Sequence, residues 1–158
     1  MKQILVATDG SMASAAAEQE AVRLCGETGA ELVIVHSWEP VHNWIGEPHY
    51  REAVSKVLRE ARETLDRPLE LADQAGIRVT TELLEGSAGQ VICEVAETHD
   101  VDLIVVGARR YGIVLRFFLG SVSRAVLQRS SRPVLVVKEG IPVPAVQSAE
   151  EQEVALVR

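Results

Sequence analysis

The sequence has few aromatic residues and few cysteines. Aromatic residues make up only 4% of the 158 residues, so the core must be built from Val, Ile, Leu and Ala. The two cysteines, Cys25 and Cys93, lie far apart in helical patterns, which argues against a disulfide framework and against a thiolate metal site. Because cysteine is usually buried, we expect both to act as small apolar residues.

The sequence also lacks a long hydrophobic run and an excess of positive charge. No stretch approaches the roughly 18 apolar residues of a membrane-spanning helix, and the apolar run near the N-terminus is too short for a signal peptide. Sixteen Lys and Arg stand against 23 Asp and Glu, a net charge of −7. Phosphate backbones and acidic membranes attract positively charged surfaces. We therefore expect a cytoplasmic protein with no nucleic-acid and no membrane partner.

Short apolar segments alternate with helical patterns along the chain. The expected strands cover residues 4–7, 32–36, 77–81, 102–106 and 133–137. This alternation predicts an α/β fold with one doubly wound (Rossmann-like), five-stranded parallel sheet and helices on both faces. The partly polar third segment, residues 77–81, indicates a sheet edge. Pro68 lies within the long helix that precedes this segment and is expected to kink that helix or break its last turns. Residues 1–139 form the predicted domain and residues 140–158 a C-terminal tail.

Two segments carry small and polar residues directly after an expected strand. They are Thr8-Asp9-Gly10-Ser11 and the longer stretch Gly107–Ser123. In an open parallel sheet, ligands bind beyond the carboxyl ends of the strands where the strand order reverses. Ser121 is expected to cap a helix, whose free amides and dipole form an anion site. Arg109, Arg110 and Arg116 would add guanidinium groups suited to phosphate, although an ordinary capped helix after a solvated basic loop would show the same pattern.

Other kinds of site find less support. The sequence has no Gly-x-x-x-x-Gly-Lys loop, and no Gly-x-Gly-x-x-Gly follows the first strand. His42, Glu47 and His49 share one loop but lack a clear further metal ligand. His36 ends a buried strand, which favours a hydrogen-bonded core histidine. No Ser/His/Asp or Cys/His set can be justified from order alone.

The order of these motifs resembles the universal stress protein family. The resemblance covers about residues 2–138 and is carried by residues 4–11, 85–88, 101–107, 120–123 and 132–137. It implies the strand order 3-2-1-4-5, which places the first and fourth strands at the switch point. Those are the strands that lead into the two segments selected above.

The resemblance implies a site for ATP or a related adenine nucleotide, with or without Mg²⁺. Nucleotide-binding members carry Gly, two residues, Gly, nine residues, then Gly and Ser or Thr. Here the motif falls on Gly107, Arg110 and Gly120-Ser121, so an arginine replaces the middle glycine. A non-glycine residue in a left-handed conformation costs roughly 1–2 kcal/mol. An arginine–phosphate hydrogen bond returns roughly 1.5–3 kcal/mol, so both signs stay open.

The same resemblance assigns the expected site residues. Asp9 would lie near the ribose or adenine, with Ala7 and Thr8 near the base and Val35 and Ser37 flanking it. The full expected set is Ala7, Thr8, Asp9, Val35, Ser37, Val106, Gly107, Arg109, Arg110, Gly112, Gly120, Ser121, Val122 and Ser123.

The resulting hypothesis is a stress-response regulatory protein that binds an adenine nucleotide and is not an enzyme. Hydrolysis needs a base for water and a metal held by carboxylates, and Asp9 is the one acid that the argument brings to the crevice. A nucleotide-independent dimeric interaction module and a slow ATP hydrolase or phosphotransferase remain as alternatives. The apolar edge segment Pro133–Val137 predicts a homodimer by strand pairing, unless the tail covers that edge.

Overall fold

The computed structural model describes residues 1–41, 46–47, 49–108, 119–138 and 140. Its strands form one parallel, five-stranded sheet in the order β3-β2-β1-β4-β5, so the predicted fold class and strand order are confirmed. The tail expected from residue 140 onward lies outside the described residues apart from Gly140. The elements are β1 (Gln3–Ala7), α1 (Met12–Thr28), β2 (Glu31–Trp38), α2 (His49–Gln74), β3 (Val79–Glu85), α3 (Ala88–Thr98), β4 (Leu103–Ala108), α4 (Ser121–Arg129) and β5 (Val134–Lys138).

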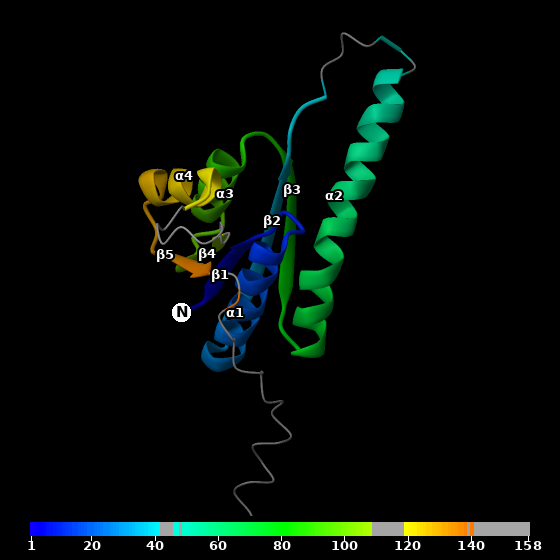
Figure 1. Ribbon diagram of the computed structural model, residues 1–158. Helices are drawn as coiled ribbons and strands as arrows, with labels where there is room; N and C mark the ends of the chain where they lie inside the picture. Colours follow the sequence, from blue (N-terminus) through cyan, green and yellow to red (C-terminus); the bar gives the residue numbers. More distant parts are fainter. Residues whose placement is uncertain (42–45, 48, 109–118, 139, 141–158) are drawn as a thin grey trace, which may run out of the picture.

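Helices cover both faces of the sheet, because successive strand side chains point to opposite sides. Ile4 and Val6 of β1 pack with α1 and α2, whereas Leu5 packs with α3 and α4. Figure 1 shows the two helix pairs on opposite sides of the strands. Both clusters are aliphatic, with Val, Ile, Leu and Ala as their main residues. The low aromatic content therefore gives an aliphatic core, which still covers both faces of the sheet.

The third strand lies at the sheet edge as expected, but its bounds differ from the predicted residues 77–81. It begins at Val79 and continues to Glu85, paired with β2 as far as Trp38. The polar residues Glu82 and Glu85 made the strand seem to end early. In the structure Glu85 is exposed at the edge, while Glu82 is half-buried with its carboxylate 2.8 Å from His99 Nε2, so neither charge interrupts the ladder.

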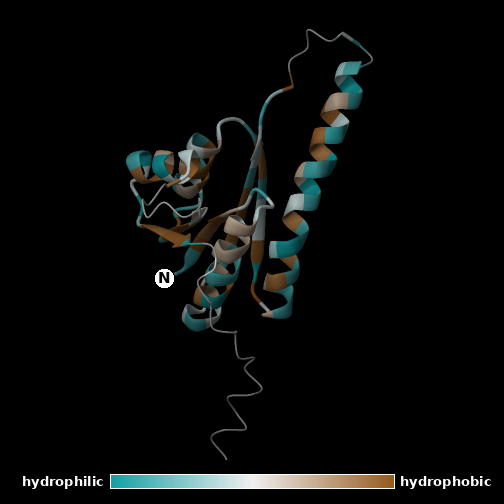
Figure 2. Ribbon diagram, in the orientation of Figure 1, coloured by the Kyte–Doolittle hydropathy of each residue, from teal (hydrophilic) through white to brown (hydrophobic). Residues whose placement is uncertain are grey.

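The long helix α2 continues through Pro68 to Gln74, so of the two expected effects of Pro68, a kink or a break, the break does not occur. Leu65, Pro68 and Ala72 are buried one turn apart against the sheet, and this packing retains the helix despite the missing backbone donor. Figure 2 shows alternating apolar and polar patches along α2, as expected for a helix with one buried face. Its N-terminal half extends beyond the sheet (Figure 1).

Neither cysteine is in a disulfide: Cys25 is buried and Cys93 is half-buried. Burial raises the pKa of the Cys25 thiol to about 12, which leaves it protonated and unreactive. In the part of the chain that the structure describes, no helix combines the length and the apolar character needed to cross a membrane.

Candidate functional site

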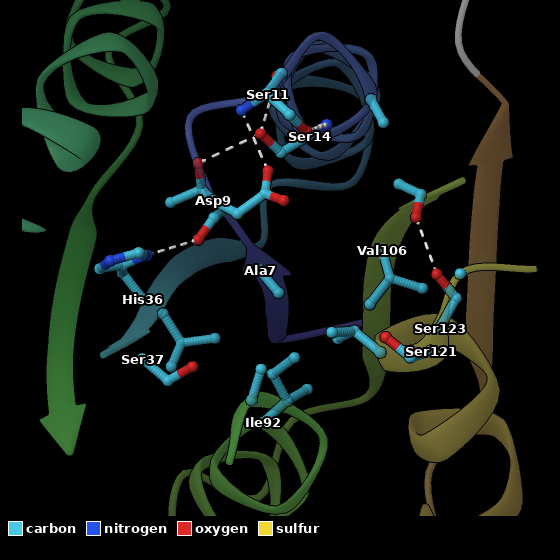
Figure 3. A pocket seen from close by; sticks show the side chains of 17 residues that line it. Ala7, Asp9, Ser11, Ser14, His36, Ser37, Ile92, Val106, Ser121 and Ser123 are labelled. Atoms are coloured by element: carbon cyan, nitrogen blue, oxygen red, sulfur yellow. Dashed lines mark hydrogen bonds between the residues drawn. The ribbon is translucent and has the colours of Figure 1, made fainter. Parts of the chain in front are cut away.

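A pocket of about 240 Å³ lies where the carboxyl ends of β1, β2 and β4 meet the N-terminal ends of α1, α3 and α4. Figure 3 shows Ala7 between His36 and Ser37 of β2 on one side and Val106 and Ser121 on the other. This is the switch point of the sheet, since β2 and β4 flank β1 on its two sides.

Every expected site residue that the structure describes lines this one pocket: Ala7, Thr8, Asp9, Val35, Ser37, Val106, Gly107, Gly120, Ser121, Val122 and Ser123. Arg109, Arg110 and Gly112 lie outside the described residues. Ser11, part of the turn selected from the sequence, also lines the pocket, and sequence reasoning missed five further lining residues, Ala13, Ser14, His36, Ala88 and Ile92. The spacing of Ala88 and Ile92, one helical turn apart at the start of α3, could have indicated a common face.

The turn between β1 and α1 presents Asp9 at the pocket. Gly10 has a φ of 76°, a left-handed conformation that favours glycine. The Ser11 amide donates to Asp9 Oδ1 at 3.0 Å, and the Ser11 hydroxyl caps α1 by accepting from the Ser14 amide at 3.2 Å. The Asp-Gly-Ser sequence thus fixes both the turn and the start of the helix.

Thr8 is held from two directions behind this turn. His36 Nδ1 lies 2.8 Å from the Thr8 carbonyl oxygen, and since a carbonyl only accepts, Nδ1 carries the hydrogen. The Thr8 hydroxyl donates to Glu18 Oε1 at 2.6 Å. The expectation of a hydrogen-bonded histidine is confirmed, but His36 is half-buried at the pocket wall and precedes the end of β2 by two residues.

Gly107 is required by close packing between β4 and α1. A Cβ at this position would fall inside van der Waals contact of the Ala13 carbonyl oxygen and 2.9 Å from the Ser14 amide nitrogen. The buried Ser123 hydroxyl donates to the Gly107 carbonyl oxygen at 2.8 Å, which ties the start of α4 to the end of β4. In this structure, therefore, that hydroxyl is engaged with the backbone.

The N-terminus of α4 opens at the other side of the pocket. Gly120 is the N-cap and Ser121 the first helical residue, so the expectation that Ser121 caps the helix is wrong by one position. The first intrahelical bond runs from the Arg124 amide to the Gly120 carbonyl oxygen. The amides of residues 121–123 therefore have no acceptor within the helix, and such an end, with the helix dipole, favours negatively charged groups.

Gly120 differs from Gly107 in its surroundings. An added Cβ at Gly120 would meet no atom of the described residues within 4 Å, and its φ of −57° suits any residue. Within that part of the chain, neither packing nor backbone conformation requires glycine there. The open space at this position lies directly at the α4 amides.

The charged groups of the described pocket wall are few. Asp9 is its only carboxylate and His36 its only imidazole. Among the described residues, no cluster of His, Cys, Asp and Glu could hold a metal ion. Of the loop residues considered above as metal ligands, His42 lies outside the described residues, and Glu47 forms an ion pair with Arg51 at 2.8 Å.

The sequence matches the model of the Universal stress protein family over residues 1–138. A universal stress protein of Thermus aquaticus is 36% identical over 137 residues, which cover 87% of this chain and 98% of that protein. One from Methanocaldococcus jannaschii is 35% identical over 141 residues, covering 87% and 82% of the two chains. A universal stress protein solved in complex with cAMP is 25% identical with a TM-score of 0.67, covering 88% of this chain and 98% of that one. The chain belongs to the universal stress protein family.

The contact between Gly107 and α1 predicts a loss of stability in Gly107→Ala. Because the methyl group would collide with backbone atoms and not with a flexible side chain, we expect the free energy of unfolding to fall by about 1–3 kcal/mol. Urea denaturation measures this change. As control, Gly120→Asn should alter it by only a few tenths of a kcal/mol, since asparagine is a good N-cap and the site is open. Equal stability of Gly107→Ala and the wild type would contradict the packing argument.

Proposed function

We propose that this universal stress protein binds ATP or a related adenine nucleotide, as a regulatory ligand, in the pocket between β1 and β4. One observation carries the proposal: the N-terminus of α4, whose first three amides have no acceptor within the helix, and the Asp9 turn line one pocket. The related structure in complex with cAMP supports an adenine nucleotide as the ligand class. The expected cytoplasmic location and stress-response role are part of this proposal.

The pocket wall suits the separate parts of a nucleotide. Val35, Val106 and Ile92 provide an apolar surface against which a purine can pack. Asp9 is a hydrogen-bond acceptor for ribose hydroxyls. The amides at the start of α4 are donors for phosphate oxygens. Ala7, Thr8 and Ser37 would then border the base, as the family resemblance implies.

Arg109, Arg110 and Gly112 complete the proposed site from outside the described residues. Arg110 replaces the middle glycine of the nucleotide motif. Its effect on ATP affinity is measured with the variant Arg110→Gly. A gain in affinity would identify Arg110 as an obstruction, and a loss as a phosphate ligand. Any Mg²⁺ would arrive with the phosphates, since the described wall offers one carboxylate, Asp9, and Mg²⁺ binds through few carboxylates plus substrate phosphate.

We infer regulation and no physiological catalysis. Nucleotide hydrolysis needs a positioned base and a metal clamp, and the described wall supplies only Asp9 and His36 as titratable groups. The Nδ1 hydrogen of His36 is already donated to the Thr8 carbonyl. Turnover above the buffer background that disappears in Asp9→Ala would favour the slow hydrolase or phosphotransferase instead.

The phosphate position is tested by a matched pair at the α4 N-cap. Aspartate and asparagine are equally good N-caps, so both variants retain the helix, but only Gly120→Asp adds negative charge at the amides. In isothermal titration with ATP and Mg²⁺, we expect Gly120→Asp to bind at least about tenfold more weakly than Gly120→Asn, a difference of about 1.4 kcal/mol.

Two outcomes would contradict the proposal in different ways. Equal affinity of Gly120→Asp and Gly120→Asn would place the phosphates away from α4. A wild-type protein that releases no heat and shows no thermal shift at millimolar ATP would favour the nucleotide-independent interaction module.

The edge position of β5 supports a homodimer as the proposed assembly. Among the residues that the structure describes, β5 pairs only with β4, and Val134, Leu135 and Val136 are half-buried. Backbone groups on such an edge are available for pairing with another chain, and two identical edges can close a two-fold dimer.

Light scattering of the full chain and of a chain without residues 142–158 tests this assembly. We expect both to be dimers, because the proposed interface uses Pro133–Val137 and not the tail. A monomeric full-length protein whose truncated form associates would show instead that the tail covers the edge.

A further inference from the structure

The carboxylate of Glu18 is fully buried beside the pocket. Glu18 has 0% exposure, and it lies on the buried side of α1 together with Ala17 and Ala21. A carboxylate is almost never buried completely unless it is paired. The partner comes from another helix, Arg67 of α2, which lies beside α1 on the same face of the sheet (Figure 1).

The two side chains form a double contact. Arg67 Nε donates to Glu18 Oε2 at 2.6 Å and Nη2 donates to Oε1 at 2.8 Å. The hydrogen bonds with Glu18 raise the pKa of Arg67 above its ordinary value, so the guanidinium stays charged at all physiological pH. Glu18 Oε1 also accepts the Thr8 hydroxyl at 2.6 Å, which joins the pair to the end of β1.

The same guanidinium continues to the backbone of the β1–α1 turn. Arg67 Nη1 donates to the Gly10 carbonyl oxygen at 3.3 Å and Nη2 to the Ser11 carbonyl oxygen at 3.2 Å. Nη2 also contacts the Ser14 hydroxyl at 3.2 Å. The turn that carries Asp9 is therefore held at Thr8 before it and at Gly10 and Ser11 after it.

The contacts of Glu18 and Arg67 go beyond what the packing of α1 on α2 requires. Replacing a buried ion pair with apolar side chains of similar volume is often neutral or stabilising. The planar fork of arginine, in contrast, fixes the direction of several acceptors at once, which a flexible apolar side chain cannot do. The acceptors that Arg67 directs are the backbone carbonyls of Gly10 and Ser11, the two residues that follow Asp9.

We propose that Glu18 and Arg67 are positioning residues of the nucleotide site, which hold the turn at residues 8–11 so that Asp9 meets the ligand in a fixed geometry. The inference rests on the proposed function for its ligand. Its structural part, the hold on the turn, stands on the contacts of this chain alone.

Two variants separate positioning from stability. Arg67→Lys keeps a positive charge near Glu18 but loses the planar fork that contacts Gly10 and Ser11. The double variant Glu18→Gln with Arg67→Met removes both charges together, so no buried charge is left unpaired. Arg23→Met is the matched control, because Arg23 also binds two carboxylates on α1, Glu20 and Glu27, but contacts no residue of the turn.

Two readouts are taken on each folded variant: ATP affinity by isothermal titration, and solvent exchange of the Gly10 and Ser11 amides by NMR without nucleotide. These amides donate to Thr8 Oγ1 and Asp9 Oδ1, so their exchange reports the turn directly. For both test variants we expect about tenfold weaker ATP binding and about tenfold faster exchange, at a thermal midpoint within a few degrees of the wild type. Arg23→Met should change neither.

Wild-type affinity in a folded test variant would overturn the positioning role, whether or not exchange accelerates. Unchanged exchange would show that the turn does not depend on the pair and would also overturn it. If the wild type itself binds no ATP, the proposed function fails, and the exchange rates still decide whether Glu18 and Arg67 hold the turn. If one variant does not fold, the other gives the same decision.

Discussion

The two central strands send their following helices to opposite faces of the sheet, and the site depends on this divergence. β1 leads into α1 on one face, whereas β4 leads toward α4 on the other. Neither helix can cover the carboxyl ends of both strands, so a pocket opens between them. Gly107 sets how closely the two sides approach, since a side chain there would collide with the backbone of α1.

The two walls of the pocket are built differently: the α4 wall presents backbone groups, and the α1 wall is joined by charged side chains. The α4 side presents backbone amides, which in the proposed function would bind the phosphates without a charged side chain. On the other side, Glu18 and Arg67 join α1, α2 and the end of β1 through charged hydrogen bonds. Glu18 is buried in this pair while Arg67 is partly exposed. We infer that the pair acts more through geometry than through stability, because apolar residues could fill the Glu18 position without the desolvation cost of a carboxylate.

Much of the fold follows from the sequence because buried parallel strands are continuous apolar runs. The end of β3 could not be predicted, because Glu85 is exposed at the sheet edge and Glu82 has its partner in His99, 17 positions away on another element. Asp9 and Gly120 were found because each follows a strand or begins a helix. The contact of Glu18 with Arg67 was missed, because the two residues lie 49 positions apart and only the packing of α1 on α2 brings them together.

The most direct measurement of the central claim is the mapping of amide chemical shifts in the ¹⁵N-labelled protein during titration with ATP and Mg²⁺. The account predicts saturable shifts of the amides of Asp9, Gly107 and residues 121–123, the two opposing sides of the pocket. Residues at the amino ends of the strands, such as Gln3 and Asp102, should not respond. Shifts confined to those ends, or no shifts at millimolar ATP, would contradict nucleotide binding at this site.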